Sequence, residues 1–210
     1  MTTATDFWVL IHAERARLAD MLDGLSAEQW RSPSLCAAWT VEQVTAHLTA
    51  AARTGTWAWI RSIVRAGLNA DTHNARLLAR YLGRTPEETL TAFRDSVALT
   101  IAPTKDYAAF LGEVIVHGQD MARPLGIELT PDPVAVREVA DFFVAKDFAV
   151  HSRSAVKGLR LDATDAAIST GSGPVVRGRL LDLVMAMAGR TAYCAELSGD
   201  GVDELRRRLG

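Results

Sequence analysis

Apolar residues recur at helical spacing along the first 150 residues, and this periodicity restricts the fold more than any other feature of the sequence. In residues 6–25 the apolar positions are three, four or seven apart: Phe7, Ile11, Leu18, Leu22 and Leu25. Such spacing places them on one face of an amphipathic α-helix. Similar stripes occur in residues 41–51, 86–101, 107–121 and 132–150, and shorter helical patterns in residues 55–68 and 74–83. The first 150 residues are therefore predicted to form a helical bundle.

Two of these segments have clear start signals. Thr40 precedes residues 41–51 and Gln43 follows three positions later, which is the pattern of a capping box. Thr85, Pro86 and Glu88 give the same signal for residues 86–101, with proline at the first helical position. We predict helices that begin directly after each threonine.

Residues beyond about 155 have a different pattern. The stretches LRLDATD and AAISTG alternate or carry β-branched residues, PVVRG is short and bounded by turn residues, and LLDLVMAMAGR is strongly helical. These features are typical of short strands followed by a helix. The predicted fold class is mainly α, with a helical bundle over residues 1–150 and a small α+β domain over residues 151–210.

The composition argues against several classes of protein. The 23 basic and 25 acidic residues give a net charge of -2, so no overall field attracts a polyanion, and no nucleic-acid partner is expected. The two cysteines form no CxxC pair, which argues against a disulfide framework or a cysteine zinc knuckle. No apolar run reaches the ~18 residues of a membrane span and no signal peptide is evident, so we expect a cytoplasmic protein with no membrane partner.

The first candidate functional residue is His47. It shares a helical face with Val44, Leu48 and Ala51, because the four residues have the spacing i, i+3, i+4 and i+7. The imidazole is therefore expected to point into the bundle. An inward histidine of this kind is compatible with a hydrogen-bonded core residue as well as with a metal ligand.

The second candidate is the pair Glu113 and His117 in GEVIVHGQD. Residues four apart lie one above the other on a helix, so both side chains can aim at one point. Two imidazoles and a carboxylate are a known ligand set for a catalytic divalent metal such as zinc, and bundle cores are a recurring place for such sites. We predict a metal site at His47, Glu113 and His117, with a buried polar pair as the alternative interpretation.

Three stretches occur in order along nearly the whole chain: LCAAWTVEQVTAHL, GEVIVHGQDMARPLG and LRLDATDAAISTGSGPVVRGRLLDLVMAMAGR. Together they resemble the mycothiol-dependent maleylpyruvate isomerase family. The resemblance implies a DinB-like, up-down four-helix bundle that binds a metal, with a small C-terminal α/β domain. It also implies that His47, Glu113 and His117 correspond to the family's metal ligands. One departure is AAW at residues 37–39, where the family has glycine before the tryptophan.

The resemblance also implies a reaction. Mycothiol, a low-molecular-weight thiol, would be the cosubstrate, and a divalent metal would favour its deprotonation. The thiolate would add to the double bond of an unsaturated keto acid, the adduct would rotate about the resulting single bond, and elimination would return the thiol. The same thiolate can instead displace a leaving group in S-transfer.

Other interpretations stay open at the level of the sequence. One is a DinB-like metal protein in which the metal activates water for hydrolysis, and another is a non-catalytic small-ligand or stress-response protein. Zinc is the favoured metal, although nickel, manganese or iron also accept nitrogen and oxygen ligands. The expected partners are a small-molecule substrate and a thiol, in a monomer or a homodimer.

The remaining polar residues receive weaker predictions. Asp120, three positions beyond His117, is either a support for that imidazole or a plain helix-end carboxylate. Both cysteines are expected to be inert, with Cys36 packed near Trp39. Three arginines are candidates to bind an anionic substrate, although each also fits a solvated surface residue: Arg80, Arg84 and Arg190. Three histidines are expected at the surface or at helix caps: His12, His73 and His151.

Overall fold

The computed structural model describes residues 2–36, 39–56 and 70–210. The chain divides into two compact units, Met1–Pro131 and Asp132–Gly210. This division lies earlier than the boundary expected near residue 150, because the helix that follows Asp132 packs against helices of the second unit. The predicted helix over residues 55–68 lies almost entirely outside the described residues.

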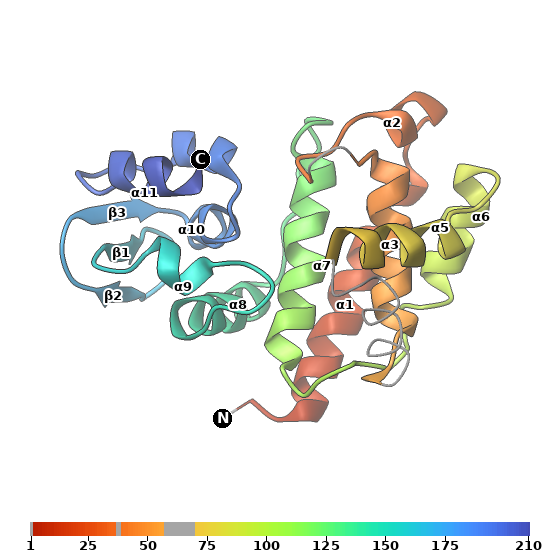
Figure 1. The fold of residues 1–210 in the computed structure, drawn as a ribbon, viewed down its shortest axis with the longest axis horizontal. Helices are drawn as coiled ribbons and strands as arrows, with labels where there is room; N and C mark the ends of the chain where they lie inside the picture. Colours follow the sequence, from red (N-terminus) through yellow and green to blue (C-terminus); the bar gives the residue numbers. More distant parts are fainter. Residues whose placement is uncertain (1, 37–38, 57–69) are drawn as a thin grey trace. The chain divides into compact units, whose positions relative to one another are not determined.

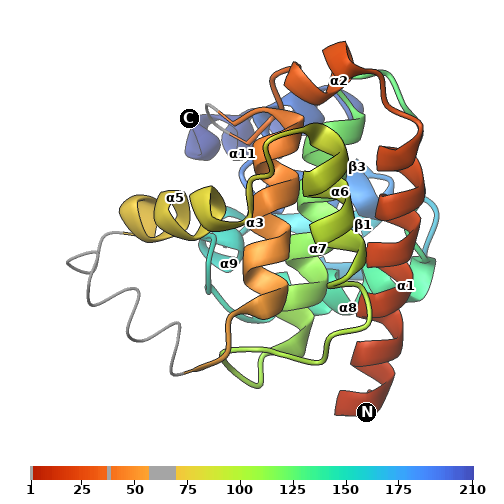
Figure 2. The ribbon, with the colours of Figure 1, turned by 90° about the vertical axis from the view of Figure 1, so that its right-hand side faces the viewer.

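The first unit is a bundle of helices. Its described helices are α1 (Ala4–Asp23), α2 (Ala27–Arg31), α3 (Val41–Arg53), α5 (Ala70–Tyr81), α6 (Pro86–Arg94) and α7 (Tyr107–Ala122). Helix α1 packs against α6 and α7, and α3 packs against the same two helices and α5 (Figures 1 and 2). The predicted helical bundle is therefore confirmed, with α1, α3, α6 and α7 packed against one another as its four core helices.

The directions of these helices differ from a simple up-down order. Thr89 of α6 bonds to Glu42 at the start of α3, whereas Arg53 at the end of α3 reaches the carbonyl of Ala92. Helices α3 and α6 are therefore parallel. Helices α1 and α7 are parallel as well, since Phe7 contacts the ring of Tyr107 near both N-terminal ends. The expected alternation holds between α1 and α3 but not between α3 and α6 (Figure 2).

A continuous apolar core joins the four helices. Its buried members come from α1, α3, α6, α7 and the α2 region: Leu18, Ala19, Leu22, Trp30, Val41, Val44, Leu48, Leu90, Phe93, Val114 and Met121. Burial of side chains of this size contributes about 1.5–3 kcal/mol each. The predicted stripes of the first, second and fourth helical segments supply most of this core, so the periodicity in the sequence identifies the buried faces correctly.

The predicted helix starts are confirmed, with one change. Thr40 caps α3 and forms a reciprocal capping box with Gln43. Thr85 caps α6 through the backbone N–H of Glu88, but the Glu88 carboxylate accepts from the backbone of Arg84 instead of Thr85. The capping box expected at Thr85 is thus only half formed.

Helix α6 is shorter than the segment predicted over residues 86–101. It ends at Arg94, and Ile101 is 38% exposed instead of buried. Asp95 is the C-cap, the Ser96 hydroxyl donates to the carbonyl of Phe93, and the carbonyl of Ser96 accepts a hydrogen bond from Arg15 of α1. A side chain from another helix therefore competes for the backbone here, which local periodicity does not reveal.

The second unit is a small α+β fold. It contains α8 (Pro133–Ala145), α9 (Ser152–Ala155), β1 (Arg160–Ala163), β2 (Ser169–Gly171), β3 (Val175–Gly178), α10 (Leu180–Met187), the 3₁₀ helix η1 (Thr191–Glu196) and α11 (Val202–Leu209). The strand order is β2-β1-β3, with β1 antiparallel to β2 and parallel to β3. The predicted strands and the helix after them are confirmed (Figure 1).

Helix α8 ends before the predicted residue 150. Its last residue is Ala145, and Phe148 beyond it is 46% exposed. The Ser152 hydroxyl donates to the carbonyls of Phe143 and Lys146, so a side chain satisfies the last turn and the chain turns into α9. Of the described helices, none is long and apolar enough to cross a membrane.

Candidate metal centre

His47 reaches the bundle interior from the middle of α3. It is 9% exposed, and its ring lies 5.0 Å, centroid to centroid, from that of Trp39 just before the helix. The capping box at Thr40 fixes where α3 begins, and it thereby sets which face carries the imidazole. The expectation that His47 points inward is confirmed.

Glu113 and His117 lie on helix α7 and face His47 of α3. The His47 Nε2 atom is 3.0 Å from the Glu113 Oε1 atom, and the rings of His47 and His117 are 5.1 Å apart at nearly a right angle. The three side chains offer ligand atoms that all lie within 4.8 Å of one another. The structure therefore brings together, from two separate helices, the three residues that the sequence predicts as a metal site.

Asp120 supports the His117 ring from one turn further along α7. Its Oδ2 atom lies 2.9 Å from His117 Nδ1, and its side chain is fully buried. With Nδ1 engaged as donor to this carboxylate, the Nε2 atom is left to face another group. The Asp120 contact is the one expected of a residue that orients an imidazole.

The surroundings keep Glu113 ionised and His117 neutral. Burial raises the pKa of Glu113, but the hydrogen bond from His47 and the nearby charges of the histidines and Arg15 outweigh it, and the net pKa is lowered. Burial lowers the pKa of His117, and the bond to Asp120 only partly opposes this effect. A negative carboxylate and a neutral imidazole are the protonation states that a metal ion binds.

Arg15 is a charged neighbour that the sequence argument missed. This α1 residue is 4% exposed, and its Nη1 donates to the carbonyls of Ser96 and Leu99 at 3.3 and 3.0 Å. Burial lowers the pKa of its guanidinium to about 10, and the charge of Glu113 partly opposes this. Arg15 lies four residues after Ile11 and three before Leu18, so its place within the apolar stripe of α1 was the available signal.

The donor set and its spacing fit a divalent cation. His47 Nε2 and Glu113 Oε1 already approach to 3.0 Å, about the separation of two ligands that share one cation at ~2.1 Å. The nitrogen and oxygen donors suit zinc and other first-row metals. His117 would complete a three-residue set whose imidazole is already oriented by Asp120.

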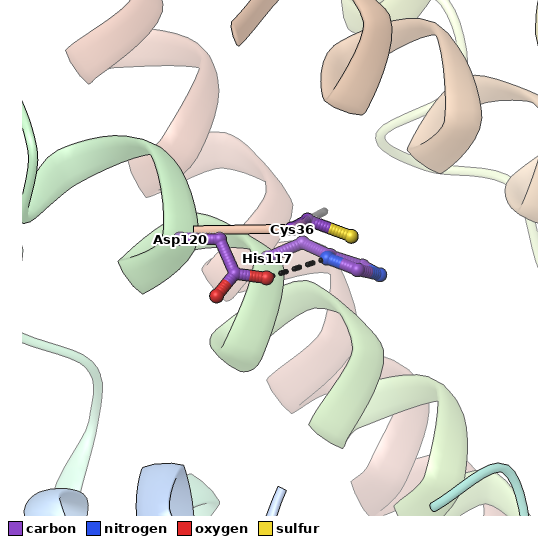
Figure 3. A group of neighbouring side chains, drawn as sticks. All are labelled: Cys36, His117 and Asp120. Atoms are coloured by element: carbon purple, nitrogen blue, oxygen red, sulfur yellow. Dashed lines mark hydrogen bonds and ion pairs between the residues drawn. The ribbon is translucent and has the colours of Figure 1, made fainter. Parts of the chain in front are cut away.

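Cys36 lies closer to the centre than a residue that only packs. Its sulfur, a nitrogen of His117 and a carboxylate oxygen of Asp120 lie within 4.8 Å of one another, and the thiol is half-buried (Figure 3). The loop before α3 is joined to the end of α7 by a hydrogen bond from the Leu35 N–H to the Asp120 carbonyl. Cys36 also packs beside the core as expected, but its neighbourhood is polar.

The arginines selected from the sequence have other partners. Arg84 is exposed and pairs with Glu88, and Arg190 of the second unit donates to the carbonyl of Ala188. Arg80 is an exposed residue in the last turn of α5.

Among the described residues, His12, His151 and Cys194 belong to neither group of potential metal ligands. His12 Nε2 is 3.3 Å from the Leu99 carbonyl, and His151 is an exposed residue at the start of α9. The side chain of His73 lies outside the described residues. Cys194 is buried in the second unit, as expected of an inert thiol, and burial raises its pKa.

Comparison with known proteins supports the family resemblance. Residues 11–106 match the family model of the mycothiol maleylpyruvate isomerase N-terminal domain, which includes His47 and ends before Glu113. Two crystal structures of the mycothiol-dependent maleylpyruvate isomerase, one of them a histidine-to-alanine mutant, each cover 94% of this chain and 93% of their own. Both have a TM-score of 0.66, with 15% identity for the mutant and 17% for the other, which shows a shared fold. No curated protein sequence matches the chain.

Proposed function

We propose that this protein is a metal-dependent enzyme that uses mycothiol to isomerise a small unsaturated keto acid such as maleylpyruvate. The observation that carries the proposal is the convergence of His47, Glu113 and His117 on one point of a bundle. The match of residues 11–106 to the isomerase family's N-terminal domain supports mycothiol as the thiol and an unsaturated keto acid as the substrate class. Zinc is the proposed metal, and the reducing cytoplasm is the proposed compartment for a thiol cosubstrate.

His47, Glu113 and His117 would hold the cation in this centre. A divalent cation supplies the positive charge that keeps a thiol deprotonated near neutral pH. The three protein ligands leave coordination positions for the cosubstrate, as in catalytic zinc sites. Asp120 keeps the His117 ring in place through its 2.9 Å contact with Nδ1, so the ring loses little freedom when a cation binds.

The charges around the centre favour anionic reactants. Glu113 and Asp120 each carry a carboxylate. The buried guanidinium of Arg15 interacts electrostatically with Glu113. A divalent cation and Arg15 together outweigh the two carboxylates. The loaded centre therefore attracts both a thiolate and the carboxylate of a keto acid, in a site of low dielectric where such attraction is strong.

In the proposed reaction, the sulfur of the thiol bonds to one carbon of the cis double bond and the π electrons move toward the keto acid. Rotation about the new single bond follows. The carbon–sulfur bond then breaks, which restores the double bond in the trans arrangement and returns the thiol. S-transfer differs because the thiolate displaces a leaving group from the electrophile and the new carbon–sulfur bond persists in a stable thioether.

The test is an isomerisation assay with purified, zinc-loaded protein, mycothiol and maleylpyruvate, followed by proton NMR of the cis and trans acids. We expect turnover that requires both the thiol and the metal, that is lost in Glu113→Ala and that is retained in the control His151→Ala. A thioether product would identify S-transfer instead. A folded, zinc-loaded protein that gives neither product would contradict the proposal.

A further inference from the structure

Cys36, His117 and Asp120 form a second group of potential metal ligands beside the first. Their sulfur, nitrogen and oxygen atoms all lie within 4.8 Å of one another, and His117 belongs to both groups. Figure 3 shows the thiol beside the His117 ring and the Asp120 carboxylate bonded to Nδ1 of that ring. The three residues come from the loop before α3 and from the last two turns of α7.

Backbone hydrogen bonds hold Cys36 in this position. The N–H of Cys36 donates to the Ser34 hydroxyl at 3.1 Å, and its carbonyl accepts from the Trp39 N–H at 3.2 Å. The adjacent Leu35 N–H donates to the carbonyl of Asp120 at 2.9 Å. Since the loop is tied to the residue that carries the carboxylate, the thiol and the carboxylate keep their spacing without a bound ion.

The charge and burial of the group also favour a cation. Asp120 is fully buried and lies two residues before the end of α7, where the helix dipole is negative and a positive charge is stabilised. Cys36 is half-buried and the His117 side chain is 13% exposed, so neither is fully shielded from solvent. Asp120 Oδ2 and His117 Nδ1 are already 2.9 Å apart, close to the separation of two ligand atoms on one metal.

We propose that Cys36, His117 and Asp120 form a second binding position for a thiophilic divalent cation such as zinc, cobalt or cadmium. The distances on one zinc, ~2.3 Å to sulfur and ~2.0 Å to nitrogen or oxygen, place ligands about 3–4 Å apart, so a small rotation of the Cys36 side chain completes the set. On binding, a metal–sulfur bond forms and the thiol proton passes to solvent, while the cation on His117 Nδ1 replaces the proton shared with Asp120, so that the ring carries its one proton on Nε2. Sulfur ligation favours soft cations over manganese or magnesium.

This second cation position is not part of the proposed isomerase reaction. A cation bound there excludes a cation bound by His47, Glu113 and His117. A neutral imidazole carries one proton on its two nitrogens, so it ligates a single cation unless that proton is also lost. His117 can therefore serve His47 and Glu113, or Cys36 and Asp120, but not both groups at once. A thiophilic cation held by Cys36 would compete with the cation of the proposed catalytic centre.

The test is a cobalt titration of the full-length His47→Ala protein, in which the first group is broken and the second is intact. A thiolate ligand to cobalt produces a near-ultraviolet charge-transfer band that nitrogen and oxygen ligands lack. We expect this band at about one cobalt per chain, and we expect Cys36→Ser in the same background to abolish it and to weaken cobalt binding roughly tenfold or more. Cys194→Ser is the matched control and should leave the band unchanged.

Two outcomes would overturn the inference. One is the absence of the band in His47→Ala protein that is folded by circular dichroism, at saturating cobalt. The other is a band that persists after Cys36→Ser or disappears after Cys194→Ser. The proposed function is tested separately, because Cys36→Ser protein that still binds zinc through Glu113 would support the catalytic centre even if sulfur ligation fails.

Discussion

Asp120 Oδ2 lies 2.9 Å from His117 Nδ1 inside the bundle, and this contact leaves the other ring nitrogen of His117 to face the candidate centre. The carboxylate is fully buried, and in the metal-free protein its contact with Nδ1 orients the ring. We therefore expect the metal affinity of His117 to depend on Asp120, a residue outside the proposed ligand set of His47, Glu113 and His117.

Replacement of Asp120 by asparagine should weaken zinc binding. The amide keeps the shape of the side chain but loses the charge that raises the basicity of the imidazole, and the expected loss is about 10-fold to 100-fold in affinity. The measurement is competition with a chelator in a Cys36→Ser background, so that only the first ligand group is observed. Asp141→Asn, which changes an exposed residue paired with Arg137, is the control. An unchanged zinc affinity in Asp120→Asn would show that the contact has no orienting role.

Substitution of the proposed ligands His47 and His117 should affect zinc retention differently from substitution of His12. In the Cys36→Ser background, His117→Ala and His47→Ala each remove one of three ligands, so we expect neither protein to retain zinc through gel filtration. His12→Ala removes a ring that contacts the Leu99 carbonyl and Trp8 away from the three proposed ligands, and it should retain zinc like the parent. Equal retention in the His47 and His12 variants would remove His47 from the centre.

Arg15→Met should destabilise the bundle. The substitution keeps the aliphatic stem but leaves the buried carbonyl of Ser96 and the carbonyl of Leu99 without their guanidinium donor, at a cost of about 1–3 kcal/mol. Arg84→Met is the control, since this exposed residue forms a surface ion pair of about 0–1 kcal/mol. Urea unfolding of the metal-free proteins gives both values. A loss in Arg15→Met no larger than in Arg84→Met would contradict the role assigned to the buried guanidinium.

The stability contributed by Glu113 should depend on pH in a defined direction. Its pKa in the folded protein lies below the ordinary 4.5, so ionisation adds stability that is fully present above pH 4.5 and is lost as the pH falls through the folded pKa. We expect metal-free Glu113→Gln to be less stable than the parent by roughly 1 kcal/mol at pH 7. The difference should shrink below pH 4.5. Urea unfolding across this range tests the sign, and a difference that grows on acidification would refute it.

The sequence predicted the ligands of the candidate centre because each is placed by local helical geometry. The inward face of α3 follows from the spacing of Val44, His47 and Leu48, and the stacking of Glu113 over His117 follows from four-residue separation. These spacings predict the folded positions correctly because the apolar stripes that contain them form the core. The family resemblance then indicated which two helices face each other.

The residues that were missed are placed by long-range contacts. Arg15 reaches the carbonyls of Ser96 and Leu99, more than 80 positions away, and thereby ends α6 early. Cys36 approaches His117 because the Leu35 backbone pairs with Asp120. The spacing of Arg15 within the apolar stripe of α1 indicates that it points inward but does not identify its partners, and the approach of Cys36 to His117 leaves no periodic signal.

The most direct test of the central claim is elemental analysis of purified, tag-free protein, with Cys36→Ser compared with Cys36→Ser/Glu113→Ala. Removing the thiol in both proteins restricts the measurement to His47, Glu113 and His117. The account predicts about one divalent metal per chain in the first protein and essentially none in the second, with both folded by circular dichroism. Equal metal content in the two proteins, or no metal in either after incubation with zinc, would contradict it.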